Sequence, residues 1–125
     1  MNCCERIPFA SRRTENLLLP LTDQKGADLA PHLPAALEFL DRAKASGRAC
    51  LVHCMVGASR SVSVVLAYLV AREGMRLGDA WRLVKQRRPV ARPNRGFAEQ
   101  LIAMDEGRGG GGAGVCLADF DARYA

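Results

Sequence analysis

The residues best placed to do chemistry lie in one short stretch, in which a cysteine is followed six positions later by an arginine. His53 and Cys54 end a short apolar run, Gly57 interrupts the chain, and Arg60 closes the stretch. A cysteine thiolate is a strong nucleophile, and the planar fork of an arginine binds two oxygens of an oxyanion such as phosphate. The pair is therefore suited to nucleophilic attack on phosphorus, provided that the fold brings both groups to one point.

The surrounding sequence predicts a strand, a loop and a helix that would position this pair. Residues 49–52 have the pattern of a short strand, and the segment from Ser59 to Glu73 has a helical pattern that Gly74 ends. Free backbone N–H groups at the start of such a helix form a nest for an anion of phosphate size. The same field favours the thiolate of Cys54. Ser61 can donate a hydrogen bond to the sulfur when the thiolate must leave.

We expect the loop to bind phosphate through its backbone, together with the side chain of Arg60. No metal or other cofactor is required, because backbone dipoles and Arg60 meet the charge on the phosphate oxygens. A free cysteine is more often a small buried apolar residue, but the strand before it, the glycine within the loop and the helix after it favour the catalytic reading of Cys54. The loop residues are Met55, Val56, Gly57, Ala58 and Ser59.

These residues resemble a known family. His53-Cys54, followed by five residues and Arg60, is similar to the signature of the protein tyrosine phosphatases. The fuller run, with Ser61 and Ala67-Tyr68-Leu69, resembles the dual-specificity branch. This resemblance implies metal-independent hydrolysis of phosphotyrosine and phosphoserine or phosphothreonine in proteins, through a phosphocysteine intermediate. It covers about Leu17 to Met104, and it continues through Arg88-Pro89, Pro93-Asn94, Gly96-Phe97 and Gln100-Leu101.

The resemblance also assigns roles outside the loop. It implies a general acid, an aspartate well before the cysteine, and Asp23 matches because it follows the apolar run that ends at Leu21. Asp28 is the alternative acid, and an ordinary surface turn is the alternative role for Asp23. The resemblance further implies that His53 orients the loop and tunes the cysteine. It implies that the side chain of Asn94 supports the phosphate loop, although Asn94 is also a good helix N-cap.

The order of predicted elements is typical of an α/β fold. By resemblance, we expect a central, mostly parallel sheet flanked by helices, of the phosphatase type, that lacks N-terminal strands of the family domain. Residues 1–16 are expected to be an irregular N-terminal segment, 17–106 a catalytic domain in which truncation is left open, and 107–125 a glycine-rich linker with a short tail. Strands are expected at 17–21 and 49–52, and helices from Pro31 to before Gly47, at 59–73, at 77–88 and after Asn94.

The composition argues against several other classes of protein. With 125 residues, 49% of them hydrophobic, the chain is one globular domain and not a disordered one. The apolar stretch from Val62 to Ala71 is far short of the roughly 20 residues of a membrane span. The N-terminus lacks the apolar core of a signal peptide, so we expect a cytoplasmic or nuclear location. The adjacent Cys3-Cys4 pair reads as part of an ordinary disordered start, with lipidation as the alternative.

We expect a phosphoprotein substrate, no nucleic acid partner and no membrane span. The uncharged loop residues favour protein substrates, since lipid-directed relatives tend to carry lysines there. The net charge of +5 and the basic region from Arg82 to Arg95 suit anionic partners. Two alternatives stay open: a non-catalytic phosphate-binding module from a truncated fold, and a phosphatase for lipid, RNA or glucan phosphate. Arg12-Arg13 followed by Leu17 and Leu19 has the pattern of a kinase docking motif, which makes a protein kinase a candidate substrate, although the two leucines are better explained as the core of a strand.

Overall fold

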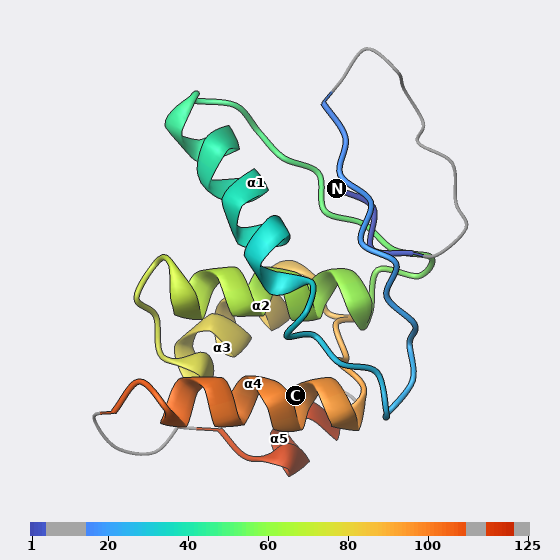
Figure 1. Ribbon diagram of the computed structural model, residues 1–125. Helices are drawn as coiled ribbons and strands as arrows, with labels where there is room; N and C mark the ends of the chain where they lie inside the picture. Colours follow the sequence, from blue (N-terminus) through green and yellow to red (C-terminus); the bar gives the residue numbers. More distant parts are fainter. Residues whose placement is uncertain (5–14, 110–114, 122–125) are drawn as a thin grey trace.

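The computed structural model of the chain describes residues 1–4, 15–109 and 115–121 (Figure 1). This described part consists of helices, a few extended segments and the loops between them. The helices, in chain order, are α1 (Leu33–Ala45), α2 (Arg60–Ala71), α3 (Leu77–Arg87), α4 (Arg95–Glu106) and α5 (Leu117–Asp121).

Three extended segments run parallel to one another at the position where the sequence predicts a sheet. Asn2 forms one parallel bridge with Leu18 and another with His53, so the start of the chain lies between the two predicted strands. Both bridges are isolated, and the described residues contain short pairings in place of regular strands. Pro20 has no backbone N–H, which limits the pairing beyond Leu19. The backbone hydrogen bonds, 2.7–3.1 Å long, join Asn2 to Leu17 and Leu19, and join Met1 and Cys3 to His53.

The first four residues are buried, so the expectation of an ordinary disordered start is wrong for them. Cys3 and Cys4 are 0% and 2% exposed, which also leaves the lipidation alternative without accessible thiols. The Met1 amino group donates to the Leu51 carbonyl at 2.7 Å. The physical reason is that this segment has a backbone partner on each side and therefore lies in the core. Residues 5–14 of the expected irregular segment lie outside the described residues.

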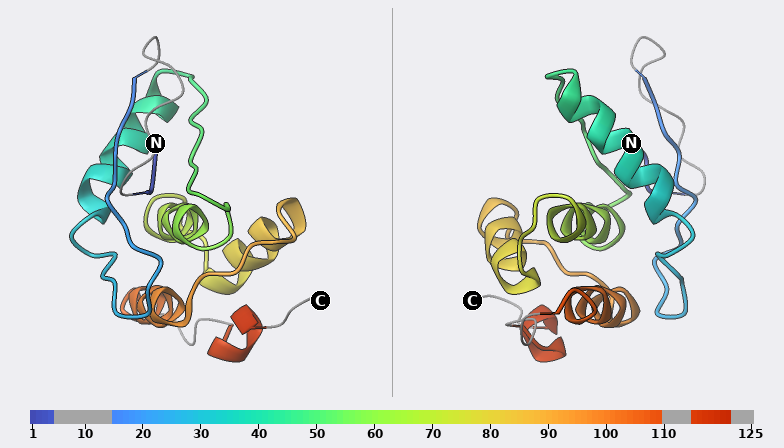
Figure 2. Two further views of the ribbon diagram at one scale, coloured as in Figure 1. Left: turned by 90° about the vertical axis from the view of Figure 1, so that its right-hand side faces the viewer. Right: turned by 60° about the vertical axis from the view of Figure 1, so that its left-hand side comes forward.

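α2 is the central helix and carries the largest share of the core. A helix that is apolar on nearly all sides is typically buried, and α2 has this composition. Helix α1 packs on one side of α2, while α3 and α4 pack on the other (Figures 1 and 2). Every helix in the described part of the chain is too short or too polar to cross a lipid bilayer. The buried apolar residues of α2 are Val62, Val64, Leu66, Ala67 and Val70.

Local signals set the helix ends, and the predicted helices are confirmed to within two residues. The ranges 59–73 and 77–88 are observed as 60–71 and 77–87. At the start of α4, the Asn94 side chain accepts the Phe97 N–H at 2.9 Å, as an N-cap does.

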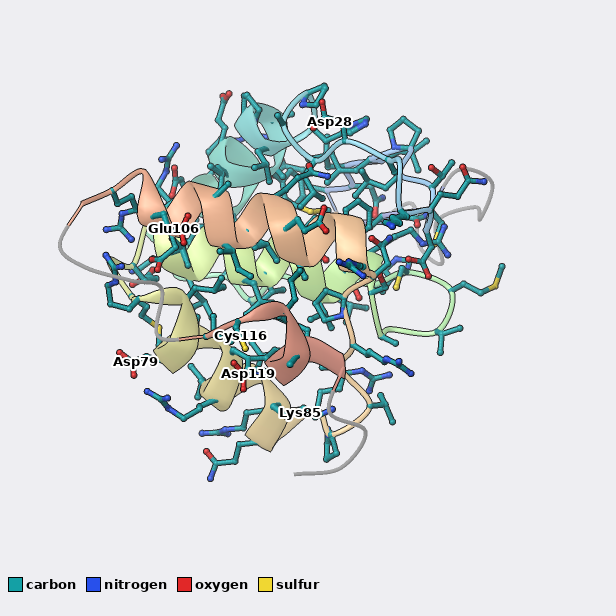
Figure 3. All side chains as sticks on the ribbon, turned by 90° about the horizontal axis from the view of Figure 1, so that it is seen from below. Asp28, Asp79, Lys85, Glu106, Cys116 and Asp119 are labelled. Atoms are coloured by element: carbon teal, nitrogen blue, oxygen red, sulfur yellow. The ribbon has the colours of Figure 1, made fainter. Side chains whose placement is uncertain are left out.

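The end of the described chain packs against α3. The Phe120 ring of α5 is 1% exposed and lies 4.7 Å, centroid to centroid, from the ring of Trp81. Asp119 accepts the backbone N–H of Cys116 at 2.6 Å; Figure 3 shows both residues from below. Burial of one aromatic side chain thus holds a segment that is too short to fold alone.

Candidate active site

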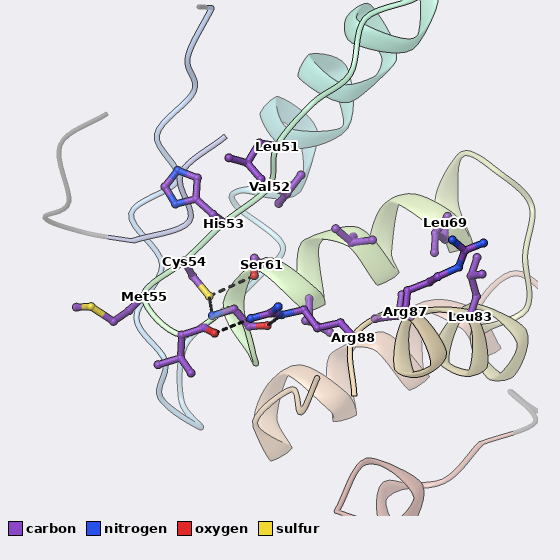
Figure 4. Close-up of a pocket in the computed structure, with 15 residues that line it drawn as sticks. Leu51, Val52, His53, Cys54, Met55, Ser61, Leu69, Leu83, Arg87 and Arg88 are labelled. Atoms are coloured by element: carbon purple, nitrogen blue, oxygen red, sulfur yellow. Dashed lines mark hydrogen bonds between the residues drawn. The ribbon is translucent and has the colours of Figure 1, made fainter. Parts of the chain in front are cut away.

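Cys54 lies at the end of the third extended segment, just before α2 (Figure 4). Its sulfur is 3.2 Å from the Ser61 hydroxyl and accepts the Gly57 N–H at 3.2 Å. Burial by itself raises the pKa of the Cys54 thiol. Hydrogen bonds from Ser61 and Gly57 and the charge of Arg60 outweigh burial, so the pKa lies below its ordinary value. The site therefore favours the thiolate, which is the nucleophilic form.

The two buried thiols of the neighbouring segment behave in the opposite way. Burial raises the pKa of Cys3 to about 12, and it also raises the pKa of Cys4. These two thiols therefore stay protonated at a pH at which the Cys54 thiol ionises. Of the three cysteines in this part of the core, Cys54 is the one that the structure prepares for nucleophilic chemistry.

Removal of the Ser61 hydroxyl should raise the pKa of Cys54. The hydrogen bond to sulfur stabilises the thiolate, so Ser61→Ala should move the pKa of Cys54 upward. The rate of alkylation by iodoacetamide, measured against pH, should then rise at higher pH than in the parent chain. Ser63→Ala is the matched control, because the Ser63 hydroxyl donates to the Ser59 carbonyl instead. An unchanged midpoint in Ser61→Ala would contradict this role.

The loop after Cys54 turns its carbonyl groups outward. The Arg88 guanidinium donates to the Val56 carbonyl at 3.0 Å and to the Gly57 carbonyl at 2.7 Å. The backbone N–H of Arg92 donates to the Ala58 carbonyl at 2.6 Å. In a trans peptide the N–H points away from the C=O, so the N–H groups that follow are directed to the inner side. The Gly57 N–H reaches the sulfur in this way. Inward N–H groups at the start of α2 form a nest for an oxyanion.

Arg88 is the functional residue that the sequence analysis missed. Its guanidinium lies directly against Gly57. Gly57 has a φ of +72°, and a Cβ atom at this position would lie 2.6 Å from an Arg88 nitrogen. The left-handed backbone favours glycine here, and a side chain at this position would displace the Arg88 guanidinium from the loop. One sequence signal for this contact was available, because Arg88 directly precedes Pro89 at the end of a predicted helix. The sequence analysis counted Arg88 only as part of the basic region and of the resemblance.

Arg60 reaches from the first turn of α2 toward the segment that precedes Asp23. Its guanidinium donates to the Leu21 carbonyl at 3.3 Å. This contact uses one of the five N–H groups of the fork, and the others can bind an oxyanion held in the loop. The contact also joins the predicted clamp to the segment that carries the predicted acid.

Asn94 connects Asp23 to the loop. Its side-chain amide donates to the Asp23 carboxylate at 3.0 Å and to the Gln24 carbonyl at 3.3 Å. Its backbone N–H donates to the Ser59 hydroxyl at 2.9 Å. The resemblance implies that the side chain of Asn94 supports the phosphate loop. In the structure the backbone makes that contact, and the side chain holds the predicted acid.

The segment after Asp23 packs directly on the start of α4. A Cβ atom at Gly96 would lie 1.9 Å from the Lys25 carbonyl oxygen, so only glycine permits this contact. Asp28, the alternative acid, accepts the Ala30 N–H at 3.1 Å in an exposed turn; Figure 3 shows it at the surface of the molecule. The structure thus ties Asp23 to the loop through Asn94, and it gives Asp28 a local turn contact.

The remaining predicted residues frame the loop. His53 fixes its entrance through backbone bonds to Met1 and Cys3. Met55 and Val56 are 68% and 69% exposed and form its outer wall, where a bound substrate would meet them.

Comparisons with known proteins agree with this geometry. The family model described as "Dual specificity phosphatase, catalytic domain" matches residues 1–106. The chain is 43% identical over 89 residues to dual specificity protein phosphatase Mpk3 of Drosophila melanogaster, covering 71% of this chain and 22% of Mpk3. It is 46% identical over 86 residues to dual specificity protein phosphatase 1 of Arabidopsis thaliana, covering 69% and 43% respectively. The chain thus spans less than half the length of either protein.

A solved structure supports the same assignment. The crystal structure of human DUSP28 matches with a TM-score of 0.81 at 36% identity, over 86% of this chain and 73% of that one. This similarity confirms the expected phosphatase-type fold. The wider sheet that the resemblance implies is represented, in the described residues, only by the isolated parallel bridges around Asn2.

Proposed function

The chain belongs to the dual-specificity phosphatase family, and on that basis we propose that it hydrolyses phosphotyrosine and phosphoserine or phosphothreonine in proteins through a phosphocysteine intermediate. The Cys54 sulfur carries this proposal, because Ser61 and the Gly57 N–H contact it at the mouth of a loop whose carbonyls are bonded outward. Such a site offers a thiolate to phosphorus and N–H groups to the phosphate oxygens.

The reaction would proceed in two displacements. The loop N–H groups and Arg60 bind the phosphate oxygens, and the Cys54 thiolate attacks phosphorus. Protonated Asp23 donates its proton to the leaving oxygen, which departs as an alcohol or phenol. In the second step Asp23 accepts a proton from water, whose oxygen attacks phosphorus and breaks the sulfur–phosphorus bond. Ser61 stabilises the departing thiolate, and inorganic phosphate is released.

The rim of the loop supports protein substrates. Exposed Met55 and Val56 carry no charge and suit the apolar flanks of a peptide better than the polyanionic head of a phosphoinositide. A protein kinase stays a candidate substrate, but Arg12-Arg13 of the docking pattern lies outside the described residues. We propose a cytoplasmic or nuclear location, because a free catalytic thiolate persists where thiols are kept reduced.

Turnover of para-nitrophenyl phosphate by the full chain tests the function. We expect activity that vanadate inhibits, together with release of phosphate from peptides that carry phosphotyrosine or phosphothreonine. A chain that unfolds cooperatively and binds phosphate without turnover would favour the non-catalytic module. If phosphate were released faster from phosphoinositide, RNA or glucan phosphate than from phosphopeptides, the substrate would belong to that class and not to the phosphoproteins.

Arg88→Ala should lower kcat/KM by about 10- to 100-fold. The variant loses two charge-assisted hydrogen bonds that hold the loop carbonyls outward, each worth roughly 1.5–3 kcal/mol. The measurement is turnover of para-nitrophenyl phosphate, with thermal unfolding followed in parallel. Arg87→Ala is the control, because this substitution removes the same charge from the same end of α3 but leaves both hydrogen bonds from Arg88 to the loop in place. Equal activity in the two variants would exclude Arg88 as a positioning residue.

A further inference from the structure

Lys85 lies in the last turn of α3, as Figure 3 shows, and is bonded to the turn that follows this helix. Its ammonium group donates to the Pro89 carbonyl at 2.8 Å and to the Ala91 carbonyl at 2.9 Å. We infer that Lys85 is a positioning residue for phosphate binding, which acts through this turn to aim the Ser59 N–H of the loop at the bound phosphate. This inference rests on the proposed function and adds to its site a residue from outside the loop.

One peptide group carries the connection from Lys85 to the loop. The Ala91 carbonyl, which accepts from Lys85, and the Arg92 N–H, which donates to the Ala58 carbonyl at 2.6 Å, belong to the same peptide group. Cis peptide bonds are absent from the described residues, so this carbonyl and this N–H point in opposite directions from one rigid plane. A bond that fixes the carbonyl therefore also fixes the N–H that reaches the loop.

The next peptide group, between Ala58 and Ser59, continues the same relation. Its carbonyl accepts the Arg92 N–H on the outer side, so its own N–H is directed to the inner side, where the loop would hold an oxyanion. The ammonium group and the two peptide dipoles are thus aligned head to tail toward the oxyanion. Hydrogen bonds in such a chain polarise one another, so the positive charge of Lys85 strengthens the Ser59 N–H as a donor.

Further contacts hold the ammonium group and the turn in place. The Lys85 nitrogen lies 5.5 Å from the ring centroid of Trp81, within the range of a cation–π contact, and Trp81 itself packs against Phe120. Within the turn, the Ala91 N–H donates to the Arg88 carbonyl at 2.9 Å. Ala91 is 0% exposed, so its carbonyl needs a partner inside the protein, and Lys85 supplies it.

Lys85→Met tests the inference, because it removes the ammonium group and keeps an apolar side chain of similar length beside Trp81. We expect inorganic phosphate to bind the full chain roughly tenfold more weakly in titration calorimetry, since one N–H of the nest loses its fixed orientation. The kcat/KM for para-nitrophenyl phosphate should fall by a similar factor. Lys85→Arg should restore most of both quantities, because a guanidinium can donate to the same two carbonyls.

Two measurements separate positioning from a general effect of charge. Arg82→Met removes a positive charge from the same helix, at an exposed arginine that pairs with Asp79, and it should leave phosphate affinity and turnover unchanged. The loss in Lys85→Met should persist in about 1 M sodium chloride, where long-range charge effects are screened beyond roughly 3 Å. The pH midpoint of Cys54 alkylation should not move, because other groups bond to its sulfur.

Unchanged phosphate affinity in Lys85→Met would overturn the inference. So would an equal loss in Arg82→Met, a loss that disappears at high salt, or a failure of Lys85→Arg to restore binding. Fluorescence of Trp81, the single tryptophan of the chain, shows whether α3 keeps its packing. If Lys85→Met does not fold, Lys85→Gln takes its place with the same expected loss. A parent chain that binds phosphate without turnover would contradict the proposed function alone, because the affinities of the variants would still test Lys85.

Discussion

We expect Cys54→Ser to abolish turnover and to leave phosphate binding largely intact. A serine hydroxyl stays protonated near neutral pH, whereas the hydrogen bonds and charge around Cys54 hold its pKa below the ordinary value. The groups that bind phosphate, the loop N–H groups and Arg60, are unchanged by the substitution. We expect residual turnover of para-nitrophenyl phosphate below about one per cent. Titration calorimetry with inorganic phosphate should give an affinity close to that of the parent chain.

Cys50→Ser provides the matched control, because Cys50 lies in the same extended segment and its thiol donates to the neighbouring Leu51 carbonyl at 3.9 Å, away from the phosphate loop. We expect its activity to equal that of the parent chain. If Cys54→Ser kept more than about a per cent of the activity while remaining folded, the nucleophile would have to be another group. Loss of phosphate binding together with turnover would instead show that the substitution collapses the loop.

The parts of the site that the sequence predicted rest on local chemistry. Gly57 turns the loop, Ser61 lies one residue inside α2, and Asn94 caps α4, each within a few residues of the feature it determines. The helix ends follow from prolines, glycines and caps in the same way. For these elements the relation between sequence and structure is short in range, so a pattern in the sequence is enough.

The parts that the sequence did not predict rest on contacts between distant residues. The Met1 amino group bonds to the Leu51 carbonyl, 50 positions away in the sequence. Four residues are too few to show a periodicity that would predict their place in the core. Arg88 meets the Gly57 carbonyl across 31 positions, and its role depends on which way that carbonyl points. Asn94 meets Asp23 across 71 positions. Backbone direction and long-range pairing decide these contacts, and residue types alone do not encode them.

Asp23→Asn should slow the hydrolysis of substrates with poor leaving groups far more than that of substrates with good ones. A general acid contributes about 10²–10⁴-fold, and its help matters least when the leaving oxygen is already acidic. An amide keeps the size of the side chain and its contact with Asn94, but it cannot donate the proton that the leaving oxygen needs. The measurement is kcat/KM for a series of aryl and alkyl phosphates. Its dependence on leaving-group acidity should be steep in the variant and shallow in the parent chain.

Asp28→Asn separates this role from a general effect of removing a carboxylate. Asp28 lies five positions further along the same segment, and its contact with the Ala30 N–H can be kept by the asparagine oxygen. We expect its leaving-group dependence to match that of the parent chain. An equal loss on all substrates in Asp23→Asn would argue against Asp23 as the acid and for a role in holding the loop. A steep dependence in Asp28→Asn would transfer the role of proton donor to that residue.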